Sequence, residues 1–73
     1  MLRWELRVTD RLEIEEDMGL HFNRPYTIGV FRDGIYQGSV MRTRGVPYRY
    51  LGRSSARKML SRLREQLEKK KRS

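Results

Sequence analysis

Apolar and polar residues alternate one by one near the start of the chain. Between positions 2 and 8 the apolar members of the alternation are Leu2, Trp4, Leu6 and Val8. A period of two predicts a strand that buries one face. After a turn candidate at positions 9–10, the alternation resumes at Leu12 and Ile14, which predicts a short return strand. Residues 1–22 are therefore a candidate N-terminal hairpin that ends in a loop.

The middle of the chain contains the clearest local signal. Asp-Gly at positions 33–34 separates two runs rich in β-branched and aromatic residues. This dipeptide is typical of a type I′ hairpin turn, because both central residues of that turn need a positive φ. The register set by a two-residue turn pairs Gly29 with Gly38, and it places Val40 on the opposite face from Ile28.

The rest of the chain predicts a third strand and a helix. Residues 46–51 are predicted to add a strand to the hairpin, with Pro47 at its start or on an edge, because proline donates no ladder hydrogen bond. Ser54 or Ser55 can cap a helix that runs to about residue 70. The helix carries an apolar stripe with a 3.6-residue period, made of Ala56, Met59, Leu60, Leu63 and Leu67.

An apolar helix stripe and an apolar sheet face can bury each other. This pairing predicts an α+β fold, in which a small antiparallel sheet of three to five strands packs on one C-terminal helix. The 73-residue chain is expected to form a single small domain over residues 1–73. Its expected parts are the candidate hairpin at 1–22, a three-stranded sheet at 26–51 and a helix at 54–70.

The composition limits what this domain can do. Apolar residues make up 37% and charged residues 36% of the chain, which predicts a thin core, a charged surface and no deep pocket for a small-molecule substrate. The absence of cysteine excludes disulfides, thiolate metal sites and a cysteine nucleophile. The sequence has no apolar signal region at its start and no apolar run of membrane-spanning length. We expect a cytoplasmic protein with no membrane partner.

Positive charge is concentrated in the later part of the chain. The formal net charge is +8, with −3 over residues 1–18 and +11 over residues 19–73. Between Arg42 and Arg64 there are eight basic residues and no acid. Arginine outnumbers lysine thirteen to four, and its planar guanidinium suits phosphate better than an ammonium group does.

No arrangement of residues indicates catalysis. His21 is the single histidine, and the chain has no cysteine to partner it. The clustered acids at positions 13–17 lack the glycine spacing of a calcium loop and are typical of a solvated bend. The phosphate-loop pattern is absent. We therefore expect a non-enzyme without catalytic residues, cofactor or metal site.

Basic residues interleaved with aromatic residues form the positive signal. The set comprises Arg42, Arg44, Tyr48, Arg49, Tyr50, Arg53, Arg57 and Lys58. Arginine and lysine make the phosphate contacts that supply most sequence-independent affinity for nucleic acids. The start of the predicted helix adds N–H donors beside Arg53. A structural role is also open, in which Tyr48 and Tyr50 cover the core and some arginines pair with the acidic N-terminal third.

The order of elements resembles known DNA-binding domains. The third predicted strand closes with Tyr-Leu-Gly-Arg at positions 50–53, and the helix opens with Ser-Ser-Ala-Arg at 54–57. Over residues 26–68 this resembles the arm-type DNA-binding domains of phage integrases and the ethylene-response-factor DNA-binding domains of plants. The resemblance implies a sheet whose exposed arginine and aromatic residues enter the major groove. Residues 1–22 depart from the pattern, because those families usually lack extra N-terminal strands.

Two classes of function follow. The first is a small DNA-binding regulatory protein, of the kind that phages and mobile elements carry, with duplex DNA as the expected nucleic acid. The second is a phage-type transcription regulator that binds a larger protein such as RNA polymerase, with Trp4 and Tyr50 as candidate anchors. A partner lost on nuclease treatment favours the first class, and a retained protein partner favours the second.

Overall fold

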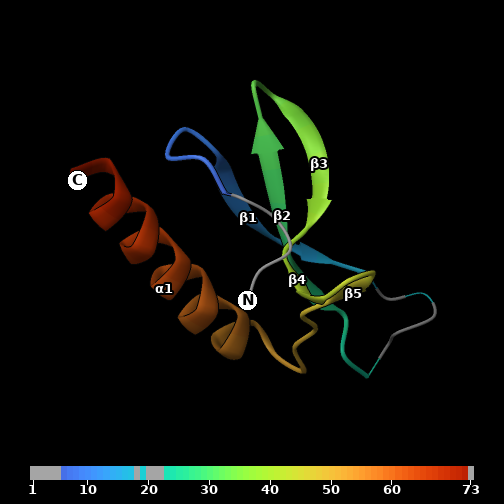
Figure 1. Ribbon diagram of the computed structural model, residues 1–73. Helices are drawn as coiled ribbons and strands as arrows, with labels where there is room; N and C mark the ends of the chain where they lie inside the picture. Colours follow the sequence, from blue (N-terminus) through green and yellow to red (C-terminus); the bar gives the residue numbers. More distant parts are fainter. Residues whose placement is uncertain (1–5, 18, 20–22, 73) are drawn as a thin grey trace.

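The computed structural model describes residues 6–17, 19 and 23–72, which form two antiparallel sheets and one helix (Figure 1). The elements are β1 (Arg11–Glu16), β2 (Tyr26–Arg32), β3 (Ile35–Ser39), β4 (Met41–Thr43), β5 (Val46–Pro47) and α1 (Arg53–Arg72). The larger sheet has the order β1-β2-β3, and β4 pairs with β5. The predicted α+β fold, a small antiparallel sheet with one C-terminal helix, is confirmed.

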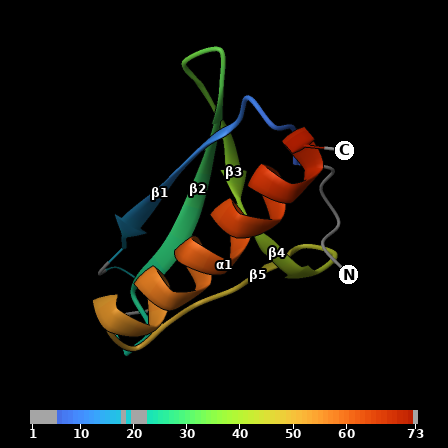
Figure 2. The ribbon, with the colours of Figure 1, turned by 90° about the vertical axis from the view of Figure 1, so that its left-hand side faces the viewer.

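The helix α1 lies across one face of the larger sheet, with the core between them (Figure 2). The buried core side chains are Leu6, Leu12, Ile28, Val30, Val40, Leu60 and Leu63. The predicted stripe of α1 is confirmed, with Ala56, Leu60 and Leu63 buried and with Met59 and Leu67 packed at its edge. From the flanks of this stripe, Arg64 and Lys70 donate hydrogen bonds of 3.2 and 2.9 Å to the carbonyls of Leu12 and Leu6.

The N-terminal third differs from the predicted hairpin. Residues 1–5 lie outside the described part of the chain, and residues 6–10 contain a turn in place of a strand. Strand β1 exists as predicted, but it pairs with β2, where Leu12 lies opposite Val30. This pairing buries the apolar side of β1 beneath α1, and burial of apolar surface is the main force that favours it. Of residues 18–24, which the sequence predicts as a loop, the structure describes 19, 23 and 24.

A β-bulge shifts the register of β2 and β3 after their first two pairs. Gly38, which has a φ of 114°, lies opposite Val30, so the predicted Gly29–Gly38 pair is wrong. The extra residue turns Val40 to the core face, where its side chain is fully buried and its N–H donates to the carbonyl of Ile28. Burial of this valine favours the bulged register over the regular one.

The predicted third strand over residues 46–51 is wrong as a member of the larger sheet. Only residues 46–47 are strand, and they pair with β4 in the second sheet. The chain then crosses the end of β2, where Tyr50 and Tyr26 exchange two backbone hydrogen bonds of 2.8 and 3.2 Å. Strand β1 takes the third place in the larger sheet because its apolar residues reach the core from that edge.

The start of α1 differs from the predicted serine cap. The helix begins at Arg53, and the carbonyl of Gly52 accepts the hydrogen bond of the Ala56 N–H at 3.3 Å. Gly52 therefore occupies the capping position, where the residue needs non-helical backbone angles. Ser54 and Ser55 lie inside the first turn, so the prediction that one of them caps the helix is wrong.

The β2–β3 turn is the predicted type I′ turn, since Asp33 and Gly34 have φ angles of 54° and 78°. We expect Gly34→Val to lower the free energy of unfolding by about 1–2 kcal/mol, because a β-branched residue is strained at this φ. Beyond the adjacent residues, no atom lies within 4 Å of the place a Cβ would take, so no clash adds to this effect. Gly34→Asn is the control, because asparagine tolerates the left-handed region. Equal urea midpoints for wild type and Gly34→Val would contradict the turn assignment.

Candidate functional site

The eight predicted binding residues come from three parts of the fold. Two are tyrosines beside the core, three are cations at the start of α1, and three are arginines near β4 and β5. Tyr48 and Tyr50 stack with ring centroids 6.3 Å apart and pack against the core. Burial raises the pKa of Tyr50, Tyr48 raises it further, and Arg62 lowers it. The two rings therefore cover the core, which is the structural role that the sequence left open.

Arg53, Arg57 and Lys58 lie in the first two turns of α1 with exposed side chains. Arg53 donates a hydrogen bond to Glu16 at 3.4 Å and lies 5.6 Å from the ring centre of Tyr26. Interactions with Tyr26 and with Glu16 raise the pKa of Arg53. Arg57 and Lys58 have no such acidic partner in the described part of the chain, so their charges are more available to a ligand.

Three arginines border one hollow, which we name the arginine depression. Its volume is about 500 Å³, and its lining consists of Arg24, Arg42, Val46, Pro47, Tyr48 and Arg49. Sequence reasoning missed Arg24, because this residue lies in a short turn far from the basic stretch and only folding brings it to Arg42. Arg44 lies on the turn between β4 and β5 with an exposed side chain.

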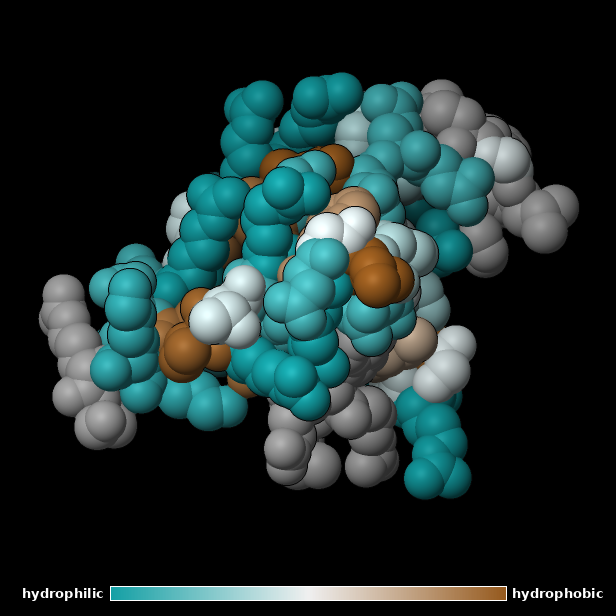
Figure 3. Space-filling model, turned by 90° about the horizontal axis from the view of Figure 1, so that it is seen from above, coloured by the Kyte–Doolittle hydropathy of each residue, from teal (hydrophilic) through white to brown (hydrophobic). Residues whose placement is uncertain are grey.

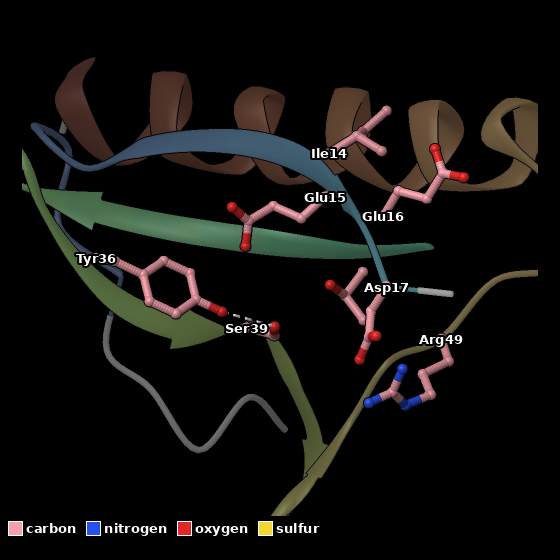
Figure 4. A pocket seen from close by; sticks show the side chains of 8 residues that line it. Ile14, Glu15, Glu16, Asp17, Tyr36, Ser39 and Arg49 are labelled. Atoms are coloured by element: carbon pink, nitrogen blue, oxygen red, sulfur yellow. Dashed lines mark hydrogen bonds between the residues drawn. The ribbon is translucent and has the colours of Figure 1, made fainter. Parts of the chain in front are cut away.

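Arg49 also borders a second hollow, the acidic depression, at one edge of the sheet; Ile14 and Glu16 point toward α1, and the other labelled side chains lie away from it (Figure 4). Its lining consists of Ile14, Glu15, Glu16, Asp17, Thr27, Tyr36, Ser39 and Arg49. Arg49 reaches this side because it lies between two tyrosines that point to the core. No ion pair joins Arg49 to a carboxylate among the described residues, and its Nη1 is shielded from solvent without a hydrogen-bond partner.

The exposed face of the larger sheet is not basic. Phe31 and Tyr36 lie side by side with ring centroids 5.4 Å apart, and Arg11 lies 5.0 Å from the ring centre of Phe31. Arg11 is paired with Glu13 at 2.8 Å, and Glu15 covers the bare glycine of β2. Among the described residues of β1, this face therefore carries one arginine and two glutamates, which differs from the basic sheet face that the resemblance implies.

The basic residues differ in whether they have a partner. Arg11, Arg32 and Arg53 pair with Glu13, Asp10 and Glu16, in that order. Six residues of the basic stretch make neither an ion pair nor a side-chain hydrogen bond within the described part of the chain, and we name them the free cations: Arg42, Arg44, Arg49, Arg57, Lys58 and Arg62. They are the part of the predicted site, extended by Arg62, that remains available for an anionic ligand.

The view from above shows hydrophilic side chains over most of the surface, with hydrophobic side chains in small separate patches (Figure 3). No helix formed by the described residues is long and apolar enough to cross a bilayer. His21 lies outside these residues, and within them no three histidine, aspartate or glutamate side chains gather as metal ligands. Comparison with protein-family models, with curated proteins and with solved structures finds no match to the chain.

Proposed function

We propose that this protein binds nucleic acid, with duplex DNA as its target and with a regulatory role that involves no catalysis. The availability of the six free cations carries the proposal, because none of them forms an ion pair with an acid among the described residues. Like charges on a small compact chain repel one another and destabilise it. A polyanion that neutralises them removes this repulsion, which supports a nucleic acid as the partner.

The type and spacing of the free cations also support phosphate as the ligand. Five of the six are arginines, whose planar fork can donate two parallel hydrogen bonds to one phosphate. Duplex DNA carries one negative charge for each ~1.7 Å of its axis, so it can meet cations that are spread over a surface. The long dimension of the molecule is 39 Å, which is close to the ~34 Å of one helical turn of DNA.

The free cations lie on two segments of the chain. Arg57, Lys58 and Arg62 are exposed on α1, and the other three lie around the β4–β5 turn. The sheet face with its paired Arg11 is not part of either segment. We therefore propose that the protein binds chiefly to the phosphate backbone, and that base contacts contribute less than in sheet-reading domains.

The salt dependence of binding tests the proposed function. Three to six phosphate contacts predict a slope of about −3 to −5 for log K against log salt concentration on duplex DNA. Arg42→Ala and Arg57→Ala should each flatten this slope by about one unit, as the loss of one phosphate contact does. Arg53→Ala should change the slope less, because Arg53 is already paired with Glu16. The matched control is Arg11→Ala, since Arg11 is paired with Glu13.

Dissociation constants above about 10⁻⁴ M for duplex DNA, single-stranded DNA and RNA near physiological salt would contradict the proposal, because ordinary non-specific binding is tighter. A protein partner such as RNA polymerase is then the second candidate. The exposed apolar side chains Val46 and Leu51, which are 49% and 71% exposed, favour such a partner near the basic segment. A pull-down with and without nuclease separates the two, since only a protein contact survives the digestion.

A further inference from the structure

The arginine depression has the composition of a phosphate site. Its charged lining is Arg24, Arg42 and Arg49, and none of its lining residues is acidic. We propose that this depression holds one backbone phosphate of the bound nucleic acid, with the attached sugar against its apolar wall. The inference rests on the proposed function, deepens it to a defined subsite and adds Arg24 to the interface.

The three guanidinium groups have no competing partners within the described residues. None of them makes an ion pair or a side-chain hydrogen bond there. Three unpaired cations around one hollow repel one another, and an anion between them is attracted to all three and offsets this repulsion. Charge-assisted hydrogen bonds from a guanidinium to a phosphate are also stronger than neutral ones.

Arg49 lies between the arginine depression and the acidic depression, because its side chain lines both. Its Nη1 atom is shielded from solvent and has no hydrogen-bond partner among the described residues. A phosphate in the open arginine depression would therefore accept hydrogen bonds from the other nitrogens of this guanidinium.

The size and the apolar wall suggest more than a bare ion. The volume of about 500 Å³ falls within the ~300–1,000 Å³ of small-molecule sites. Val46, Pro47 and Tyr48 form the apolar part of the lining, and Val46 is 49% exposed, so it is accessible to a ligand. A phosphate with its attached sugar matches a hollow that is cationic on one side and apolar on the other.

The acidic depression on the other side of Arg49 works against the bound phosphate. Glu15 and Asp17 line it together with Arg49, and so does Glu16, whose carboxylate is paired with Arg53. Carboxylates near a guanidinium attract it and repel an anion that binds it. Asp17→Asn removes one of these charges, and the amide oxygen can still accept the hydrogen bond of the Gly19 N–H, which is 3.0 Å long in the wild type. This variant should therefore bind phosphate more tightly.

The test is a titration of the ¹⁵N-labelled full chain, followed by amide chemical shifts, with the dinucleotide d(TpT), with inorganic phosphate and with thymidine. We expect d(TpT) and phosphate to shift the amides around Arg24, Arg42 and Arg49, and thymidine to leave them unchanged. Arg49→Gln should weaken d(TpT) binding about tenfold, and Arg42→Gln is a second variant with the same expectation. Asp17→Asn should tighten binding, whereas Arg57→Gln should leave the binding of d(TpT) unchanged and weaken only duplex DNA.

The outcomes separate the subsite from the proposed function. If duplex DNA binds but Arg49→Gln and Arg57→Gln weaken the binding of d(TpT) equally, the subsite is overturned and the proposed function stands. Thymidine shifts equal to those of d(TpT) would also overturn it, because the phosphate would then not be recognised. Inorganic phosphate in the depression without any binding of d(TpT) or duplex DNA would overturn the nucleic-acid assignment, for the subsite and for the function alike.

Discussion

Replacement of Leu63 by alanine is expected to lower the free energy of unfolding by about 2–5 kcal/mol, the usual range for a buried leucine. Leu63 is 2% exposed and belongs to the stripe of α1 that covers the larger sheet. A domain of 73 residues has roughly 4–11 kcal/mol of stability in total, so this loss is a large share of it. A loss of only ~2 kcal/mol already lowers the thermal midpoint by about 8–16 °C in a domain of this size.

The control for this prediction is a leucine outside the core. Leu51 is 71% exposed, and Leu51→Ala should change stability by no more than about 0.5 kcal/mol. Thermal melts of the two variants give a direct comparison, because both remove the same atoms. A midpoint for Leu63→Ala equal to that of Leu51→Ala would mean that α1 is not docked on the sheet.

Asp10→Ala is expected to cost about 3 kcal/mol of stability, because it removes the buried carboxylate of an ion pair that is hydrogen-bonded through both oxygens. The Asp10 side chain is fully buried and accepts two hydrogen bonds of 2.9 Å from Arg32, whose side chain is 21% exposed. It also accepts the backbone N–H of Arg7 at 2.8 Å. The comparison is Glu13→Ala, which breaks an exposed pair with Arg11 and should cost less than about 1 kcal/mol in urea melts.

The ion pair of Asp10 also predicts how stability depends on pH. The hydrogen bonds from Arg32 hold the pKa of Asp10 below its usual value of 3.8, against the opposing effect of burial. A carboxyl with a lowered folded-state pKa stabilises the fold above its unfolded pKa and loses this effect as the pH falls through the folded value. The stability gap between wild type and Asp10→Ala should therefore be largest at neutral pH and shrink below about pH 4. A gap that stays constant down to pH 2 would contradict the pairing.

Local sequence patterns predicted the turn, the strands and the helix better than they predicted which strands pair and in which register. The Asp33-Gly34 turn and the stripe of α1 depend on residues close in sequence, and both match the structure. The bulge at Gly38 and the pairing of β1 with β2 depend on which apolar side chains reach the core. A turn signal cannot predict that choice, since a shift of one residue changes the face of every later side chain.

The candidate site was also only partly predictable from local sequence patterns. The basic stretch from Arg42 to Arg64 was visible in the sequence, but its division into cations with and without partners was not. Alternation along residues 48–50 placed the tyrosines on the core and Arg49 on the other side, and the pairing of Arg53 with Glu16 required the contact of α1 with β1. Arg24 entered the site only through the turn before β2, because no pattern in the sequence links it to Arg42.

The most direct test of the proposed interface is the footprint of duplex DNA on the ¹⁵N-labelled chain at low salt. We expect amide shifts on residues 42–49 and 57–62, which contain the free cations, and around Arg24, which lines the arginine depression. The exposed sheet face around Arg11 and Phe31 should not shift, because its arginine is paired with Glu13. A footprint centred on that sheet face would support the major-groove mode implied by the resemblance and contradict the interface proposed from the free cations, and the absence of any footprint would contradict nucleic-acid binding itself.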